Sequence, residues 1–299
     1  MEQEAGRLLC DDGTQLDFDA LIVATGAQTS FFGRDDLRAR AIALDGIAQT
    51  VLLAESVRAH PGQRFVVAGG GYTGVEIATH LRVAQRNSGR GGEVAIVESA
   101  PSLCRTLPEP FQRYLRRRLE QIGIRLLTGT RVTAADAEGV TLDSGARLTP
   151  ARLVWSAGVE VGEPARSLGA ARTAQGRVRV NERLQAAENI FVAGDAAAVT
   201  AGQGVLRMAV PFAIGQGRAA ARNALRLLGG RAPLAYRPCD PGYVVPLAQG
   251  RGCGMVLGVP LYGRLTVALH LAMCAYRSGT AANRLAVLRS ALRGLDAER

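Results

Sequence analysis

Three glycines with the spacing G-x-G-x-x-G, Gly69, Gly71 and Gly74, form the clearest chemical pattern in this chain of 299 residues. They follow the apolar run 64–68, which predicts a strand, and they open a run with helical periodicity. In such a turn the first glycine permits a tight bend, the second lets the backbone approach a pyrophosphate, and the third lets helix and strand pack closely. The pattern therefore predicts a dinucleotide site at the start of the helix. The predicted site includes the residues between these glycines: Gly70, Tyr72 and Thr73.

Glu98 ends the next predicted strand, in the run "EVAIVES". A carboxylate at this position accepts hydrogen bonds from the 2′ and 3′ hydroxyls of the adenosine ribose, and it repels a 2′-phosphate. The sequence therefore predicts that the glycine turn binds NADH in preference to NADPH.

Glu76 follows the third glycine by two residues. A carboxylate near a helix N-terminus is stabilised by the helix dipole, so Glu76 is either an ordinary acid of a first helical turn or a contact for the nicotinamide end of the cofactor. The residues alone leave both interpretations open.

Two further motifs lie at the ends of apolar runs, "ALIVATGA" and "NIFVAGDAA". Small residues after a buried strand let the backbone pass close to a bound cofactor, and an aspartate there can bind a polyol hydroxyl. Each motif alone predicts only a strand-ending turn, but in this order around one glycine turn they predict a second cofactor. The run "VWSAG" repeats the pattern of "ALIVATG". These runs contribute the predicted cofactor-binding residues Ala24, Thr25, Gly26, Gly158, Gly194 and Asp195.

In this order the motifs resemble those of the two-dinucleotide-binding flavoprotein disulfide reductase superfamily. Within it, "ATGAQTSFFG", "GGGYTGVEIATHL" and "VWSAGVEVGEPARSLG" are most similar to type II NADH dehydrogenases, which are single-chain NADH:quinone oxidoreductases. The resemblance covers roughly residues 6–230. It implies hydride transfer from NADH to FAD and then electron delivery to a quinone.

The resemblance also implies roles for individual residues. FAD would be bound by Ala24, Thr25, Gly26 and Asp195, and NADH by Gly69, Gly71, Gly74, Glu76 and Glu98. Glu76 would help to orient the nicotinamide, and Gln216 would lie near the flavin and the electron acceptor, so these two are the predicted catalytic residues.

The chain departs from the family pattern in three ways. The family begins with a strand and its own G-x-G-x-x-G for the FAD pyrophosphate, and no such run precedes Ala20, so we expect at least one βαβ unit, roughly 30 residues or more, to be missing. Pro211 stands where the first Gln of the quinone-proximal motif is expected, although Gln216 matches the last. The terminal membrane helices of the family are only approximately matched.

The predicted fold is a doubly wound α/β protein with two Rossmann-like dinucleotide-binding domains, the NAD domain being inserted in an N-terminally truncated FAD domain. Residues 1–59 and 159–235 would form the FAD domain, and residues 60–158 the NAD domain. Residues 236–299 would provide contacts to a membrane or to a second copy of the chain in a homodimer.

The composition excludes some chemistry. The formal net charge is +10 and every basic residue is Arg, so Schiff-base chemistry by a lysine is excluded. Aromatic residues make up only 5%, which does not suit a stacking platform for nucleic acid. The arginine excess indicates an acidic partner, a membrane surface or nucleotide phosphates, unless it is a compositional bias of solvated faces.

The five cysteines form no CxxC pair, and the three histidines have no metal-ligand spacing. We therefore expect no metal site and no catalytic disulfide, with Cys104, Cys253 and Cys274 as buried structural thiols. The first residues lack the features of a signal peptide, and the apolar run "LTVALHLAMCAY" is too short to cross a bilayer. The expected location is the cytoplasm, at the inner face of the cell membrane if the protein binds it peripherally.

The run "NRLAVLRSALRGL" near the C-terminus predicts a basic amphipathic helix. This helix would either lie in a membrane interface or pack on the flavin domain or a second subunit. Its apolar face comprises Leu285, Leu288, Leu292 and Leu295.

Two other functions are also compatible with the sequence. The electron acceptor would be a small acidic redox protein, as in the related ferredoxin and rubredoxin reductases, with the arginine-rich surface as the docking face. Alternatively, the chain would be a non-catalytic protein that binds NADH alone, because the FAD pyrophosphate motif is absent from the sequence.

Overall fold

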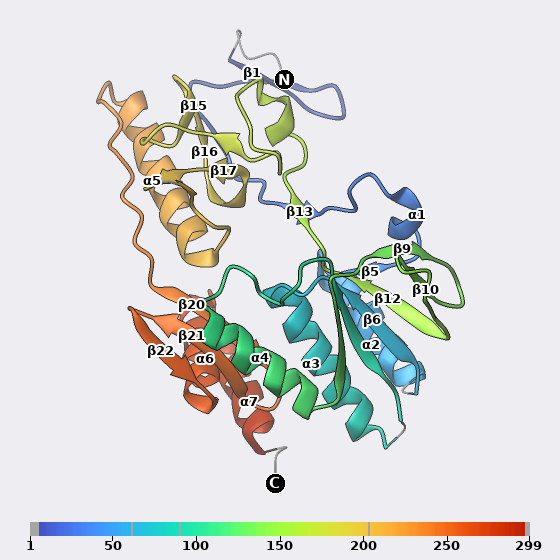
Figure 1. Cartoon of the computed structure of the whole chain (residues 1–299). Coiled ribbons are helices and arrows are strands. Elements are labelled where there is room, and N and C mark those ends of the chain that lie inside the picture. Colours follow the sequence, from blue (N-terminus) through green and yellow to red (C-terminus); the bar gives the residue numbers. More distant parts are fainter. Residues whose placement is uncertain (1–5, 61, 90, 203, 297–299) are drawn as a thin grey trace. The chain divides into compact units, whose positions relative to one another are not determined.

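The computed structural model describes residues 6–60, 62–89, 91–202 and 204–296, with side chains as far as Arg289 (Figure 1). The chain forms two compact units. Unit 1 combines Met1–Ser30 with Val159–Pro241, and unit 2 combines Phe31–Gly158 with Gly242–Arg299. Residues 31–158 of unit 2 therefore interrupt unit 1, and residues 31–59, which were expected in the FAD domain, pack in unit 2.

Unit 2 is built on a five-stranded parallel sheet with the strand order β5-β12-β6-β7-β8. The sheet strands are β5 (Ile42–Ala43), β6 (Arg64–Ala68), β7 (Val94–Glu98), β8 (Ile124–Thr128) and β12 (Ala151–Trp155). The helices of unit 2 are α1 (Asp35–Arg38), α2 (Ile47–Ala59), α3 (Tyr72–Asn87), α4 (Glu109–Gln121), α6 (Arg264–Arg277) and α7 (Ala281–Asp296).

The two faces of the sheet are buried against different layers. Phe65 and Val67 face a core that includes residues of α2, α3 and α4, whereas Val66 alternates to the other face. On α4, Phe111, Leu115 and Leu119 recur at helical spacing and are buried. Helices α2, α3 and α4 thus cover one face, and Leu37 of the short helix α1 is buried on the other.

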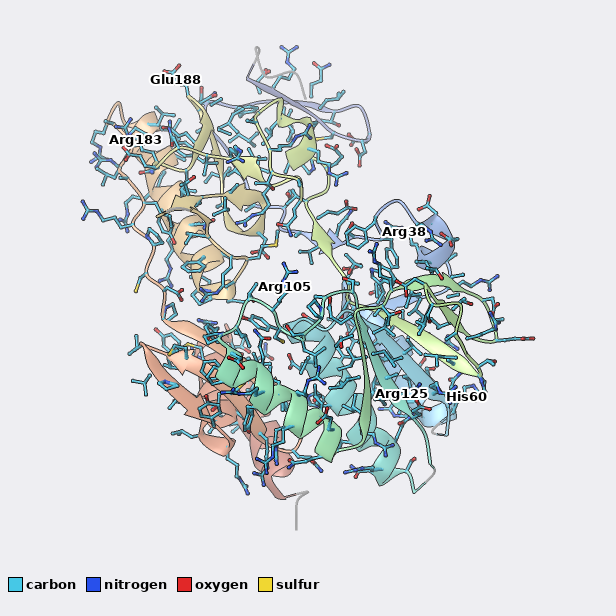
Figure 2. All side chains as sticks on the ribbon, in the orientation of Figure 1. Arg38, His60, Arg105, Arg125, Arg183 and Glu188 are labelled. Carbon is cyan, nitrogen blue, oxygen red and sulfur yellow. The ribbon has the colours of Figure 1, made fainter. Side chains whose placement is uncertain are left out.

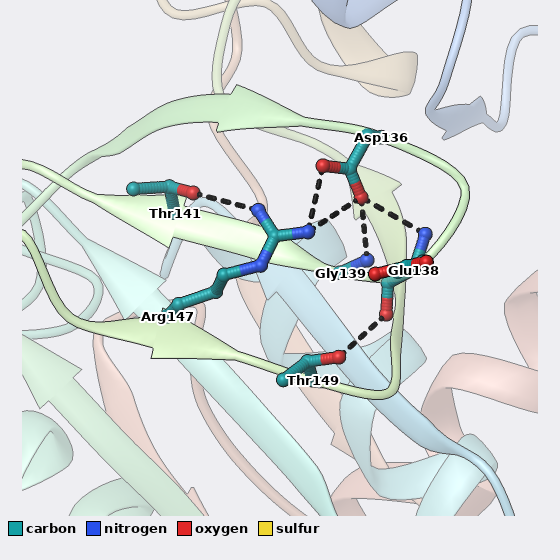
Figure 3. Close-up of polar contacts among 6 residues, drawn as sticks. All are labelled: Asp136, Glu138, Gly139, Thr141, Arg147 and Thr149. Atoms are coloured by element: carbon teal, nitrogen blue, oxygen red, sulfur yellow. Dashed lines mark hydrogen bonds and ion pairs between the residues drawn. The ribbon is translucent and has the colours of Figure 1, made fainter.

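The second face is covered by an antiparallel three-stranded meander of β9 (Val132–Ala135), β10 (Val140–Leu142) and β11 (Arg147–Leu148). Its β9–β10 turn is fixed by Asp136, which accepts backbone hydrogen bonds from Glu138 and Gly139 and pairs with Arg147 at 2.7 Å (Figure 3). The Arg147 guanidinium and these N–H groups lower the pKa of Asp136 to about 2. The meander buries Val140, Leu142 and Leu148 against this face of the sheet.

The C-terminal part of unit 2 forms a second antiparallel sheet of β20 (Gly242–Leu247), β21 (Arg251–Val256) and β22 (Val259–Tyr262). Val245, Leu247 and Cys253 belong to the same buried cluster as α3 and α4. The Ala248 N–H donates to Thr79 Oγ1 at 2.9 Å, which ties this sheet to α3. The C-terminal region therefore packs on the helices of the NAD unit.

Unit 1 contains a three-stranded sheet of β15 (Gln185–Ala187), β16 (Ile190–Val192) and β3 (Leu21–Val23), in which β16 and β3 are parallel. The long helix α5 (Val210–Leu228) packs against this sheet. The remaining elements pair in twos: β1 (Arg7–Leu9) with β2 (Gln15–Asp17), β4 (Gln28–Thr29) with β13 (Val159–Glu160), β14 (Val178–Arg179) with β17 (Ala197–Ala198), and β18 (Thr200–Ala201) with β19 (Gly204–Val205). Two short 3-10 helices, η2 (Ala165–Leu168) and η3 (Gly194–Ala196), complete the unit.

The predicted C-terminal amphipathic helix is α7. Leu285 and Leu288 are both 47% exposed, so this part of the helix does not bury its apolar face in unit 2. Leu292 and Leu295 lie outside the residues whose side chains the structure describes.

Candidate functional site

The glycine turn of unit 2 connects β6 to α3. Gly69 has a φ of +106°, which favours glycine, and a Cβ there would come within 2.7 Å of the Ser156 backbone. Gly74 lies in the first turn of α3, and a Cβ there would overlap the carbonyl oxygen of Gly69 and reach Ser156 Oγ at 2.7 Å. The first and third glycines are therefore required by the protein's own packing.

Gly71 differs from these two glycines. It is the N-cap residue of α3, with an extended backbone at φ −75° and ψ −174°, and a Cβ there would meet no protein atom within 4 Å. Neither backbone conformation nor packing requires glycine at this position. Glycine here leaves room for a phosphate to approach the backbone at the N-terminus of α3, so the turn fits a dinucleotide.

Glu98 at the end of β7 is held by backbone donors. Its Oε2 accepts the Gly70 N–H at 2.7 Å, and its Oε1 accepts the Ala100 N–H at 2.7 Å. Gly70 has no room for a side chain, because a Cβ would lie 2.5 Å from Leu103 Cδ2 and 3.0 Å from Glu98 Cβ. The geometry thus fixes the carboxylate beside the glycine turn. Oε1 also accepts the Ser99 hydroxyl at 3.2 Å, so Oε2, which accepts one N–H, is the oxygen that keeps a lone pair for a ribose hydroxyl.

A cavity of about 810 Å³ opens at the carboxyl ends of β6, β7 and β12. In the strand order, β6 is followed by β7 and β8 on one side, while the later β12 lies on its other side. The cavity therefore lies at the topological switch point of the sheet, where open α/β sheets bind their ligands, and its volume is within the range of about 300–1,000 Å³ usual for such sites. Four of the predicted residues line it: Gly69, Gly71, Glu98 and Gly158.

The other predicted residues of unit 2 do not line this cavity. Tyr72 and Thr73 lie in the first turn of α3, and Tyr72 stacks on Tyr243 of β20 at 6.3 Å between ring centroids. Because α3 begins at Tyr72, Glu76 stands in its second turn, beyond the turn over which the helix dipole acts strongly. Glu76 is therefore not an acid of the first helical turn, and burial raises the pKa of this half-buried carboxyl.

The sequence reading missed an aromatic and basic lining of the cavity. Phe31 stacks on Trp155 with centroids 5.2 Å apart, and the Arg38 guanidinium lies 4.8 Å from the Phe31 centroid. The sequence signal for these residues is the aromatic pair in the run 29–33, "TSFFG". The lining residues added by the structure include Phe31, Phe32, Arg34, Arg105, Arg131 and Trp155.

In unit 1, the predicted FAD-binding motifs follow two neighbouring parallel strands. Ala24–Gly26 follows β3, and Gly194–Asp195 follows β16. A hydrogen bond joins the two strand ends, because the Ala193 N–H donates to the Val23 carbonyl at 3.0 Å. Because parallel strands end at the same edge of a sheet, the structure brings these two motifs together. Gly26 and Gly194 have φ values of +70° and +72°, so both strands end in left-handed turns.

Gln216 of α5 joins this group. Its side chain is buried, at 1% exposure, and its Oε1 accepts the Gly194 N–H at 2.8 Å. The residue thus lies at the predicted flavin site, but its acceptor atom is already used to position the Gly194–Asp195 turn. Its contact is with the protein backbone, which a sequence motif alone does not reveal.

Asp195 is half-buried and accepts no hydrogen bond from any residue that the structure describes. Burial raises the pKa of its carboxyl, and the nearby Arg177 acts in the opposite direction. Arg177 is itself buried and donates to the carbonyls of Ala197 and Leu206. An acceptor left unpaired at a strand end fits the polyol hydroxyl of a flavin cofactor.

Within the described part of the chain, no group of three or more His, Cys, Asp or Glu residues is arranged to hold a metal ion. Cys104 and Cys253 are buried, and burial raises the pKa of each thiol to about 12, as expected for structural cysteines. No helix among the described residues combines the length and apolar character needed to cross a membrane.

Two units of α/β structure, each with ligand-binding features at the carboxyl ends of parallel strands, define a dinucleotide-binding oxidoreductase fold. Over residues 1–221 the chain matches the family described as pyridine nucleotide-disulphide oxidoreductase, and it belongs to that family. The prediction of an oxidoreductase that uses FAD and NADH is confirmed at the level of the family.

The relatives agree with this assignment. The chain is 27% identical over 278 residues to a type II NADH:quinone oxidoreductase from Staphylococcus aureus, covering 83% of this chain and 68% of that protein. It resembles the structure of NDH2 from Plasmodium falciparum in complex with NADH, with a TM-score of 0.79 at 12% identity, covering 96% of this chain and 80% of that one. The structure of a ferredoxin reductase from Rhodopseudomonas palustris gives a TM-score of 0.72 at 24% identity. The match covers 86% of this chain and 62% of that one.

Proposed function

We propose that this chain is the catalytic part of an FAD-dependent NADH dehydrogenase that transfers a hydride from NADH to FAD and then delivers electrons to a quinone. The observation that supports this most directly is Gly71, which lines the cavity at the N-terminus of α3 and at which a Cβ would meet no protein atom within 4 Å. The 27% identity to a type II NADH:quinone oxidoreductase supports the quinone as acceptor. When bound, FAD supplies the redox chemistry between NADH and the electron acceptor.

In unit 2 the protein's own groups would bind and orient NADH. The Gly70 N–H keeps the Glu98 carboxylate in place to accept the ribose hydroxyls, and the N-terminus of α3 at Gly71 would stabilise the pyrophosphate. Glu76, half-buried one turn further along α3, would assist in orienting the nicotinamide. Each of these groups would act on binding and orientation, and none is required to transfer a proton.

In unit 1 the protein would bind FAD at the ends of β3 and β16. Asp195 would accept a ribityl hydroxyl, because its carboxylate has no hydrogen-bond donor among the described residues. Gln216 is a positioning residue in this proposal, since it fixes the Gly194 N–H and thereby the Asp195 turn. Ala24, Thr25 and Gly26 would let the neighbouring strand end pass close to the flavin.

A membrane surface is the proposed source of the quinone. Along α6, Leu265, Leu269, Met273 and Tyr276 recur at helical spacing and are 59%, 40%, 42% and 77% exposed. Exposed arginines, including Arg277, Arg284 and Arg289, accompany this apolar stripe. An apolar face with basic neighbours suits the interface of a membrane with anionic lipids, and we therefore propose peripheral binding there in preference to homodimer contacts.

A second candidate function is reduction of a small acidic redox protein. One stretch of unit 1, residues 196–239, contains six arginines and no acidic residue, and Arg218 and Arg222 are exposed on α5. A basic stretch of this kind favours an acidic partner. The likeness to the ferredoxin reductase is below 25% identity and supports the fold alone.

The test begins with an absorbance spectrum of the protein after gel filtration in the presence of FAD. A retained flavin spectrum that NADH bleaches, with reoxidation by a quinone in detergent, is the expected result. Reoxidation only by an acidic iron–sulfur protein, lost at high salt, would favour the second candidate. A colourless protein that still binds NADH would overturn both in favour of a simple NADH-binding protein.

A further inference from the structure

Unit 1 contains a buried arginine that no carboxylate neutralises by direct contact. Arg177 is only 5% exposed. It forms no ion pair within 4 Å with any residue that the structure describes. Charged side chains are almost never fully buried unless they are paired, because the loss of hydration is unfavourable. A guanidinium kept in such a place indicates a role in a site.

The Arg177 guanidinium is held by two carbonyl oxygens from separate segments. Its Nε and Nη2 donate to the Ala197 carbonyl at 3.1 and 2.6 Å, and its Nη1 donates to the Leu206 carbonyl at 2.7 Å. Directly after Arg177, β14 pairs in parallel with β17, which begins at Ala197. The backbone and the side chain of this segment therefore both fix the position of Ala197.

Ala197 directly follows the 3-10 helix η3, which carries Asp195. This turn is held at both of its ends, because Gln216 Oε1 accepts the Gly194 N–H at 2.8 Å and Arg177 binds the Ala197 carbonyl. The two charges also act on each other: Arg177 lowers the pKa of the Asp195 carboxyl against the opposing effect of burial, and Asp195 raises the pKa of Arg177. Since they form no ion pair, the Asp195 oxygens remain open to a ligand.

We propose that Arg177 is the positioning residue of the flavin site, which holds the Asp195 turn in place and stabilises the Asp195 carboxylate by its buried charge while this carboxylate accepts a hydroxyl of FAD. A bound cofactor would exclude water from the half-buried carboxylate, and a nearby fixed cation offsets that desolvation. Arginine suits this role better than lysine, because its planar fork reaches two carbonyls at once. The inference rests on the proposed function, since it assumes that Asp195 binds FAD.

The test measures the Kd for FAD by equilibrium dialysis and flavin absorbance in the wild type, Arg177→Gln and Arg177→Lys. Glutamine keeps N–H donors for a carbonyl but removes the charge, so the Kd should rise about tenfold. Lysine keeps the charge and should restore the Kd to within about threefold of the wild type. Arg183→Gln is the matched control and should leave the Kd unchanged, because Arg183 is an exposed arginine on the outside of the same unit (Figure 2).

A double-mutant cycle with Asp195→Asn separates this role from a general effect on the fold. If Arg177 acts through the Asp195 carboxylate, Arg177→Gln should add less than about twofold to the loss of FAD affinity in Asp195→Asn. Two independent losses of about tenfold would instead multiply to about a hundredfold. Thermal unfolding without FAD is recorded for each variant. If Arg177→Gln does not fold, Arg177→Lys decides alone, and a folded lysine variant that loses FAD affinity tenfold or more refutes the inference.

Two further outcomes would overturn the inference and leave the proposed function intact. One is a wild-type Kd for FAD in Arg177→Gln, and the other is a fully multiplicative loss in the double variant. In both cases the wild type still binds FAD and its flavin is bleached by NADH. A wild type that binds no FAD would refute the proposed function, and the inference with it.

Discussion

Alanine substitutions at Gly71 and Gly74 should have opposite consequences although both belong to one glycine motif. A Cβ at Gly71 meets no protein atom within 4 Å and its backbone conformation is open to any residue. A Cβ at Gly74 overlaps the Gly69 carbonyl and approaches Ser156 Oγ at 2.7 Å. The first substitution should impair ligand binding alone, and the second should impair the fold.

The magnitudes follow from these surroundings. Gly71→Ala removes backbone freedom from the unfolded chain without strain, a gain of about 0.4–1 kcal/mol, but alanine is a poorer N-cap than glycine by a similar amount, so the free energy of unfolding should change by less than about 1 kcal/mol. Gly74→Ala would normally gain about 1 kcal/mol of helix propensity, but the overlap with Gly69 reverses the sign and should cost about 1–3 kcal/mol. For NADH, Gly71→Ala should raise the Kd about tenfold or more, because the methyl group occupies the phosphate position.

The two quantities are measured on the same samples. Denaturant unfolding gives the free energy of unfolding, and Trp155 fluorescence titrated with NADH gives the Kd. Gly91→Ala serves as a control, because a Cβ there also meets nothing within 4 Å, and Gly91 does not line the cavity. Wild-type NADH affinity in Gly71→Ala would refute the assignment of this turn to the pyrophosphate.

Four other substitutions test the remaining assignments. Gln216→Leu leaves the Gly194 N–H without its acceptor and should cost about 1–3 kcal/mol in denaturant unfolding, and an unchanged stability would show that this hydrogen bond is dispensable. Asp195→Asn should weaken FAD retention about tenfold in gel filtration followed by absorbance, whereas full retention would remove Asp195 from the flavin site. Burial raises the pKa of Glu76 above its ordinary value of 4.5, so the neutral carboxyl is the form that folding favours and stability is lost as the pH rises through the folded pKa. Glu76→Gln should therefore raise the Tm at pH 8 and leave it unchanged at pH 4, and equal shifts at both pH values would contradict this reasoning. Glu98→Gln should weaken NADH binding and strengthen NADPH binding in the Trp155 titration, and parallel changes for both nucleotides would show that Glu98 acts on the fold instead.

Much of the local organisation was determined by the sequence. The strand, turn and helix around Gly69–Gly74 follow from an apolar run, a glycine spacing and a helical periodicity, all of which act between residues close in the chain. The stripe of Phe111, Leu115 and Leu119 on α4 follows in the same way from a period of 3.6 residues. The order of the motifs was enough to indicate two dinucleotide sites.

The tertiary structure alone decided which distant residues complete each site. Arg105 and Arg131 reach the cavity because backbone hydrogen bonds tie their segments to Gly70 and Glu98, and no periodicity in an arginine-rich chain distinguishes them. Gln216 is buried against the Gly194 turn, a contact made across 22 positions. Local patterns reflect interactions between near neighbours, whereas these contacts depend on how separate elements pack, and only the folded chain specifies that.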